Sequence, residues 1–235
     1  MGKNTAKPRP SGRQASSPAP KRTGLWIAVG VAAVVAIAGL VAIVGAGGDD
    51  EVTEGSVPAD GSVPSGTVAE TWPITVTGSP LPPLEDPAAD PAVGTPAPGL
   101  SGYTFDGTPV EIDPSKGPVM LVFLAHWCEH CNREVPELLK WQASGAVPEG
   151  LQVIGVTTAV SADRPNYPPS EWIVDKGWDW PVLADSQAVD AATAMGVSGF
   201  PFSVIIGTDG TVLARSSGEL GQAGIEAFVA DALGS

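Results

Sequence analysis

Cys128 and Cys131 form a Cys-x-x-Cys pair and are the only cysteines in the 235-residue chain. A pair at this spacing supports thiol redox chemistry or supplies part of a metal site, and it excludes a four-cysteine zinc site. The thiolate is the attacking species in disulfide exchange, and helix N-termini and Cys-x-x-Cys settings lower cysteine pKa values to roughly 3.5 to 7.5. We therefore expect Cys128 to be the nucleophile and Cys131, one helical turn later, to be the resolving thiol.

A strand followed directly by a helix is predicted to position this pair. Residues 118–125 form a continuous apolar run of strand length, which is typical of a strand buried on both faces. Residues 129 to about 144 have the apolar spacing of a helix, with Pro136 as a kink. Cys128 then lies beside the unpaired amides and the positive dipole end of the helix, which favours its thiolate.

Strands and helices alternate through the rest of the C-terminal region. This order predicts an α/β fold with a mixed sheet. Asp106 and Gly107 mark a first hairpin turn, and residues 207–210 mark a second. We expect the tryptophans at 172, 178 and 180 to pack in the core. The expected strands are 102–105, 108–112, 151–157, 181–184, 202–206 and 212–216, and the expected helices are 169–176, 186–195 and 219–233.

The N-terminal region has the composition of a membrane anchor. Residues 1–24 contain six basic and no acidic side chains and are predicted to form a disordered tail. Residues 25–44 are uncharged and apolar, long enough for a transmembrane helix across roughly 30 Å of hydrocarbon. A cleaved signal peptide is the alternative. All 26 acidic residues follow this segment, so the positive-inside rule places the tail in the cytoplasm and the rest outside.

The segment that follows, residues 45–92, is rich in Gly, Ala, Ser and Pro. It is predicted to be a flexible linker with one strand-like island at 71–76, and residues 93–235 are predicted to form the folded domain. Disulfides persist outside the cytoplasm, so thiol chemistry suits this location. The net charge of −14 argues against nucleic acid as a partner.

Residues 119–136 resemble the active-site segment of thioredoxin-fold proteins. Trp127 matches the tryptophan before the first cysteine, and Pro136 matches the kink proline of the first active-site helix. Residues 93–98 and 105–107, together with Glu134, make the chain most similar to the membrane-anchored TlpA/ResA-like thiol-disulfide oxidoreductases. The resemblance implies a thioredoxin-like fold, with a mixed central sheet and flanking helices. It also implies a redox-active Cys128/Cys131 disulfide with no further cofactor and no metal.

The same resemblance assigns the substrate-binding residues. Pro201 corresponds to the family's cis-proline, which faces the cysteines. A cis bond at this position exposes the preceding backbone to an extended substrate. Phe200 and Trp127 would line the substrate groove.

Three further positions bear on proton transfer and redox tuning. Glu134 is either a proton acceptor for Cys131 or merely solvated. His130 would stabilise a neighbouring thiolate when protonated, as in the strongly oxidising DsbA group, or it is an exposed spectator. Val122 stands where classical thioredoxins carry a buried aspartate, so the resemblance leaves Glu134 or water to serve in proton transfer.

The predicted function is disulfide exchange between the extracytoplasmic domain and exported protein thiols or disulfides, with a membrane or extracytoplasmic redox partner. Its direction is open between reduction, as in cytochrome c maturation, and DsbA-like oxidation. A copper-delivery module that holds Cu(I) on the same cysteines is the alternative from a different class. A peroxidase of the peroxiredoxin type is disfavoured, because Ala125 occupies the position of the threonine that such an enzyme requires.

Overall fold

The computed structural model describes Gly2, Val52, residues 54–57, Val63 and residues 66–234. The predicted transmembrane helix at residues 25–44, the predicted basic tail apart from Gly2, and much of the predicted linker before residue 66 lie outside the described residues. Within the part that the structure describes, no helix combines the length and apolar character that a membrane span needs.

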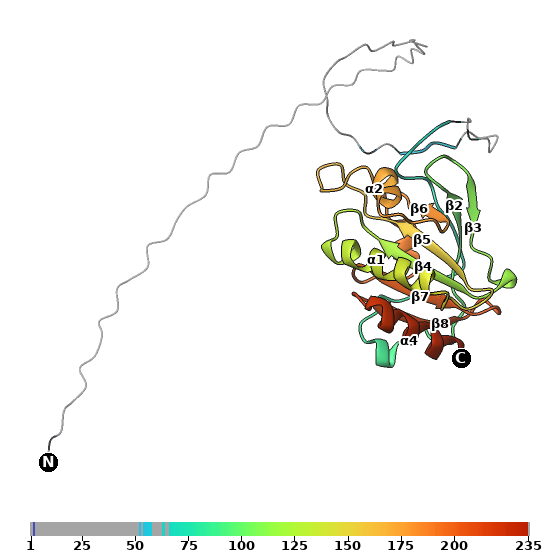
Figure 1. The fold of residues 1–235 in the computed structure, drawn as a ribbon, viewed down its shortest axis with the longest axis vertical. Helices are drawn as coiled ribbons and strands as arrows, with labels where there is room; N and C mark the ends of the chain where they lie inside the picture. Colours follow the sequence, from blue (N-terminus) through green and yellow to red (C-terminus); the bar gives the residue numbers. More distant parts are fainter. Residues whose placement is uncertain (1, 3–51, 53, 58–62, 64–65, 235) are drawn as a thin grey trace, which may run out of the picture. The chain divides into compact units, whose positions relative to one another are not determined.

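The described chain is built on one mixed sheet (Figure 1). Its strands follow the order β1-β2-β6-β5-β4-β7-β8, and β3 pairs with β2 beside this path. Both predicted hairpins are present, as antiparallel β2–β3 and antiparallel β7–β8. The strands are β1 (Thr75–Thr77), β2 (Gly99–Tyr103), β3 (Pro109–Glu111), β4 (Val119–Leu124), β5 (Gln152–Thr157), β6 (Val182–Ala184), β7 (Phe202–Ile206) and β8 (Val212–Ser217).

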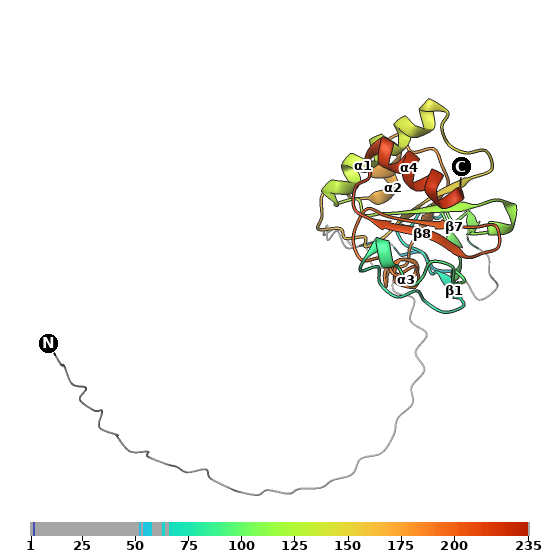
Figure 2. The same ribbon diagram turned by 90° about the horizontal axis from the view of Figure 1, so that it is seen from below.

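Helices cover both faces of the sheet. Helices α1, α2 and α4 lie on one face and α3 lies on the other (Figure 2). Of the three predicted core tryptophans, Trp172 and Trp178 are buried on the α1 face, and Trp180 packs partly buried against them. The helices are α1 (Glu129–Ser144), α2 (Pro169–Asp175), α3 (Asp190–Ala194) and α4 (Gly221–Leu233), and short 3-10 turns occur at Pro87–Ala89 and Pro114–Lys116.

Strand β4 is the centre of the sheet and the element that leads into the cysteines. It pairs in parallel with β5 and antiparallel with β7, and all six of its side chains are buried. Alternate residues enter the two cores: Met120, Val122 and Leu124 pack under α1, whereas Leu121 and Phe123 pack on the α3 side. The prediction of a strand buried on both faces is confirmed, and its apolar run is explained by this double burial.

The prediction that residues 66–92 belong to a flexible linker is wrong, because this segment packs against the rest of the domain. Trp72 is fully buried, Leu81 and Leu84 are buried, and β1 pairs with β2. Glu70 accepts hydrogen bonds from the amide and the hydroxyl of Ser170, at 3.0 and 2.7 Å. The composition hides this packing, because isolated large apolar residues between prolines and glycines anchor the segment without a periodic pattern.

Helix α3 is shorter than the predicted 186–195. The buried carboxylate of Asp185 accepts the amide protons of Ser186, Ala191 and Ala192 and the hydroxyl proton of Thr158. Because Asp185 binds the free amides at the start of the helix, residues 186–189 form a turn and the helix begins at Asp190.

A buried ion pair joins the segment before β2 to β8. Asp90 and Arg215 form two parallel hydrogen bonds of 2.8 and 2.5 Å, and both side chains are almost fully buried. The remaining guanidinium nitrogen donates to the carbonyls of Pro82 and Met195. All three guanidinium nitrogens of Arg215 therefore have hydrogen-bond acceptors, as a buried arginine requires.

Candidate active site

Cys128 is the N-cap residue of α1 and follows the short turn that connects β4 to this helix. Its Sγ accepts the amide proton of Cys131 at 3.3 Å, and its carbonyl accepts the amide proton of Asn132 at 3.0 Å. Both cysteines are free thiols, with Cys128 7% exposed and Cys131 fully buried. Cys128 Sγ is thus the more exposed of the two sulfurs, and it lies at the positive end of the helix dipole.

Burial makes the Cys131 thiol difficult to ionise. Removal from water raises its pKa far above the ordinary value, and the proximity of Cys128 and Glu134 adds to the effect. A thiol that stays protonated neither attacks a client nor reacts with solvent oxidants. Cys131 therefore has the properties of a thiol that acts only on its neighbour Cys128.

The loop before β7 brings a cis peptide bond to the outer sulfur. The Phe200–Pro201 bond is cis, as predicted, and Cys128 Sγ donates to the carbonyl oxygen of Phe200 at 3.6 Å. The loop leaves α3 through Gly196, whose φ is +67°, and a Cβ there would lie 2.3 Å from the carbonyl oxygen of Pro82. Glycine is required at this point, because any side chain would displace the loop that carries Pro201.

Trp127 and Phe200 meet beside Cys128 from two different elements. Their rings contact edge to face with centroids 6.1 Å apart. Trp127 is half-buried, and its indole nitrogen donates to the carbonyl of Ala159 at 2.8 Å. The predicted groove residues Trp127, Phe200 and Pro201 are therefore brought together around the reactive sulfur.

Glu134 is buried on the first turns of α1, so the predicted alternative of a solvated carboxylate is wrong. It is 4% exposed, and its oxygens accept the amide protons of Leu220 and Gly221 at 3.0 to 3.2 Å. Burial raises the pKa of the Glu134 carboxyl, although these two amides oppose the shift. Glu134 thus holds the N-terminus of α4 against α1 and keeps a carboxyl of raised pKa near Cys131.

His130 is exposed and belongs to a charged cluster. Its Nδ1 pairs with the carboxylate of Glu219, which also accepts three hydrogen bonds from the Arg133 side chain at 2.6 to 3.2 Å. Arg133 also pairs with Glu129. The carboxylate of Glu219 was not predicted as a site residue, because it lies 89 positions from His130 and comes close only when α4 packs on α1.

His126 and Asn132 also belong to the site, and sequence reasoning assigned them no role. His126 is almost fully buried; its Nδ1 lies 2.8 Å from the carbonyl of Pro165, and its Nε2 lies 3.2 Å from the amide of Ser161. Burial lowers the pKa of this imidazole. The Asn132 amide group donates to the carbonyls of His126 and Cys128, and its oxygen accepts the indole proton of Trp172. These contacts fix the turn that presents Cys128.

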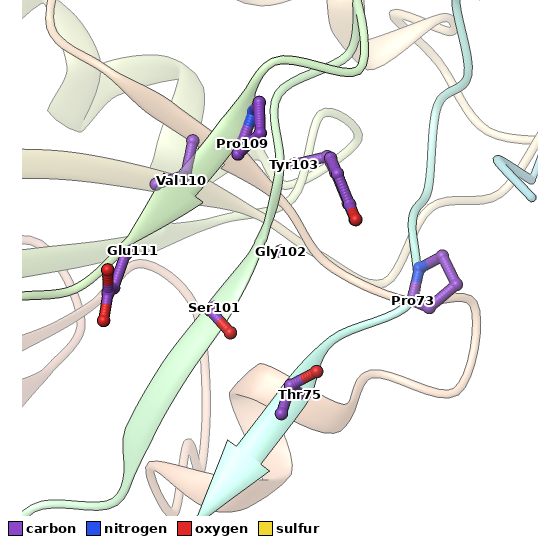
Figure 3. Close-up of a pocket in the computed structure, with 8 residues that line it drawn as sticks. All are labelled: Pro73, Thr75, Ser101, Gly102, Tyr103, Pro109, Val110 and Glu111. Carbon is purple, nitrogen blue, oxygen red and sulfur yellow. The ribbon is translucent and has the colours of Figure 1, made fainter. Parts of the chain in front are cut away.

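Within the described residues, no cluster of three or more His, Cys, Asp or Glu side chains could hold a metal ion. A surface depression of about 500 Å³ lies over β1, β2 and β3, and neither cysteine nor Pro201 lines it (Figure 3).

Comparison with known proteins identifies the family. The model of the AhpC/TSA family matches residues 93–215, which is more than half of the chain. The chain belongs to the AhpC/TSA family. Among curated proteins no match was found.

One solved structure shares the fold at a TM-score of 0.50, and two others are similar in sequence. A candidate thiol:disulfide interchange protein DsbE from Chlorobium tepidum is 24% identical with a TM-score of 0.50, covering 60% of this chain and 97% of its own. A thioredoxin-family thiol:disulfide interchange protein from Chlorobium tepidum TLS is 27% identical with a TM-score of 0.48, covering 62% and 99%. The thioredoxin domain of a thiol-disulfide oxidoreductase from Bacteroides vulgatus is 25% identical with a TM-score of 0.48, covering 59% and 98%. The fold of this family member is therefore thioredoxin-like.

Proposed function

We propose that the chain is a TlpA/ResA-like thiol-disulfide oxidoreductase in which Cys128 attacks client disulfides and Cys131 resolves the intermediate. One observation carries the proposal: the two thiols are inequivalent. Cys128 Sγ lies at the N-terminus of α1 and against the Phe200 carbonyl of the cis bond, whereas Cys131 is sealed below it. This arrangement suits a two-step exchange, because the Cys128 sulfur can react with the client whereas the Cys131 sulfur can react only with Cys128.

The exchange balances as a two-electron transfer. The Cys128 thiolate attacks one sulfur of a client disulfide, and the other client sulfur leaves as a thiolate that takes up a proton. The Cys131 sulfur then attacks Cys128 Sγ, which releases the second client thiol and leaves a Cys128–Cys131 disulfide. The client gains two electrons, and a dithiol partner at the membrane or outside it must return the protein to the reduced state.

Glu134 is proposed to receive the Cys131 proton during the second step. A group that accepts a proton at neutral pH works best when its own pKa is raised toward that pH, and burial raises the pKa of Glu134. The proton of Cys131 needs such an acceptor because burial holds the thiol protonated. Val122 supports this role, since the strand beneath the cysteines carries no carboxylate of its own.

The reducing direction is favoured over DsbA-like oxidation. An oxidant owes its strength to stabilisation of the thiolate in the reduced form, and a cationic His130 would supply such stabilisation. The carboxylate of Glu219 contacts His130 Nδ1 and would offset such a charge. A reduction potential near that of thioredoxin, about −270 mV, is therefore expected rather than one near that of DsbA, about −120 mV.

We further propose that the domain works outside the cytoplasm, anchored by residues 25–44. The supporting features are the uncharged apolar segment and the six basic residues before it. The clients are disulfides of exported proteins, and cytochrome c maturation is the process that the TlpA/ResA resemblance implies.

Trapping of intermediates tests the proposed function. In a Cys131→Ser variant of the full chain, the client should remain attached to Cys128 through a mixed disulfide that survives alkylation and is released by dithiothreitol. A Cys128→Ser variant, which keeps the buried thiol, is the matched control and should trap nothing. Equal trapping by the two variants, or none by either against a disulfide-bonded model protein, would contradict the assignment.

A further inference from the structure

A loop formed by residues 158–168 carries an exposed arginine to the edge of the active site. The guanidinium carbon of Arg164 lies 4.8 Å from the centroid of the Trp127 ring. Trp127 contacts Phe200, and the Phe200 carbonyl faces Cys128 Sγ. Arg164 is thus exposed and linked to the Cys128 sulfur through Trp127 and Phe200.

Hydrogen bonds to the two residues before the cysteine turn hold this loop in place. The buried ring of His126 bonds to the carbonyl of Pro165 and the amide of Ser161. The Asn166 side chain donates to the His126 carbonyl at 2.9 Å, and the Trp127 indole donates to Ala159. Because contacts occur on both sides of Arg164, the position of the guanidinium is coupled to the turn that presents Cys128.

Arg164 is also set apart by its charge. Six basic side chains follow residue 48, against 26 acidic ones. Lys116, Arg133, Lys140 and Arg215 each pair with a carboxylate, and Lys176 donates to the backbone carbonyl of Asn132. Among the described residues, Arg164 has neither contact and meets only the face of Trp127. Stacking leaves the planar fork of N–H donors free, and that fork matches the two oxygens of a carboxylate.

We propose that Arg164 is a specificity residue that binds an aspartate or glutamate side chain close to the reacting cysteine of the client polypeptide. The inference rests on the proposed function and extends it by naming a class of client. Charge complementarity supports an acidic client side chain. The net negative charge of the domain repels a carboxylate in general, whereas the Arg164 guanidinium, which pairs with no carboxylate among the described residues, attracts one. The ring of Trp127 holds the cation over the groove, so the client carboxylate and the client sulfur are engaged together.

Three disulfide-bonded peptides that differ at one flanking position test the inference. The position next to the reacting cysteine is Glu, Gln or Lys, and the second-order rate constant of exchange is followed by tryptophan fluorescence in the reduced full chain. The Glu peptide should react about two- to five-fold faster than the Gln peptide, the size expected from an exposed ion pair. The Lys peptide should be slower still, and the differences should shrink at high salt.

Variants of Arg164 separate carboxylate binding from a structural role. Arg164→Gln should remove the preference for the Glu peptide, so that the ratio of the Glu peptide rate to the Gln peptide rate falls to about one. Arg164→Glu should invert the order of the Glu and Lys peptides, and Arg164→Lys should keep part of the preference. Lys116→Gln is the matched control, since it removes the same charge before β4, at the strand end opposite the cysteines, and should preserve the preference.

Two results would overturn the inference in different ways. If Arg164→Gln slows all three peptides by the same factor, or leaves the ratio of Glu to Gln peptide unchanged, Arg164 does not read a carboxylate while the proposed function stands. If the native chain exchanges with none of the peptides, the proposed function itself fails and the inference fails with it.

Discussion

The Asp90–Arg215 ion pair and the active site are both buried polar clusters, and they differ in how completely their polar groups are paired. At the Asp90–Arg215 pair, both carboxylate oxygens and three guanidinium nitrogens have partners. At the active site, which comprises Cys128, Cys131, Glu134 and Pro201, the Cys131 thiol and the Glu134 carboxyl have pKa values raised by burial. A buried charge whose hydrogen bonds are all satisfied stabilises the fold. Buried groups whose ionised form is not fully stabilised have shifted pKa values, which suits them to proton or electron transfer.

Removal of the Cys128 thiol should have the largest effect, and this effect should be on disulfide exchange and not on stability. Cys128→Ser should lower the rate of disulfide exchange by at least about a thousand-fold, because the variant lacks the nucleophile of the first step and the sulfur that Cys131 attacks in the second. Exchange is measured with a disulfide-bonded model protein, and unfolding in urea is measured in parallel. Retained activity, or a large loss of stability, would break the distinction between the two clusters.

Disruption of the ion pair should have the opposite signature. Arg215→Met leaves the Asp90 carboxylate buried and unpaired, so the free energy of unfolding should fall by about 3–5 kcal/mol. Asp90→Asn combined with Arg215→Met should recover part of this loss. In the native chain Arg215 lowers the pKa of Asp90, so the stabilisation from the pair is present above the ordinary carboxyl pKa and is lost as the pH falls through the lowered one.

Titration therefore offers a check on this second prediction. The gap in unfolding free energy between the native chain and Arg215→Met should narrow in acid, where Asp90 becomes neutral in both. A gap that stays constant from neutral pH to pH 3 would mean that lost packing, rather than the unpaired charge, causes the destabilisation.

Glu134→Gln should produce an intermediate effect with a pH signature. If Glu134 accepts the proton of Cys131, the mixed disulfide should resolve about ten- to a hundred-fold more slowly at neutral pH, and the rate should lose its dependence on a carboxyl ionisation. Rapid quenching with acid and mass spectrometry would follow the intermediate. An unchanged rate would assign Glu134 to the contact with α4 alone.

The stability of the same variant has a definite sign. Burial raises the pKa of Glu134 in the folded state, so its ionisation opposes folding as the pH rises through that value. Glu134→Gln should therefore gain stability relative to the native chain at neutral pH and lose that advantage in acid. The opposite trend would mean that the Leu220 and Gly221 amides outweigh burial.

The smallest effect is expected at the exposed cluster. Glu219→Gln removes the carboxylate that offsets His130, so the thiolate becomes better stabilised and the reduction potential of the cysteine pair should rise slightly. Equilibration with glutathione buffers would measure the shift, and the same substitution in a His130→Gln background serves as the control. A fall in potential, or an equal shift in both backgrounds, would argue against transmission through His130.

Sequence reasoning captured the elements that carry strong periodic or apolar patterns. The run at 118–125 and the helix over 129–144 correspond to β4 and α1 almost residue for residue, and Cys128 therefore stands where predicted. The approach of Pro201 to Cys128 was accessible only through the family resemblance, because nothing local brings residues 73 positions apart together.

Features that depend on single long-range contacts were not accessible. Residues 66–92 read as a linker because Trp72, Leu81 and Leu84 are isolated anchors, although each is buried. The roles of His126 and Glu219 arise from the loop at 158–168 and from the packing of α4, respectively. The only hint in the sequence is that His126 lies two positions before the predicted nucleophile Cys128. This places His126 near the site but does not show which residues its ring contacts.

The inequivalence of the two thiols can be tested directly by a short pulse of iodoacetamide on the reduced native chain at neutral pH, followed by peptide mass spectrometry. The structure predicts alkylation at Cys128 alone, with Cys131 modified only after unfolding in urea. Equal modification of the two cysteines, or faster modification of Cys131, would contradict the account.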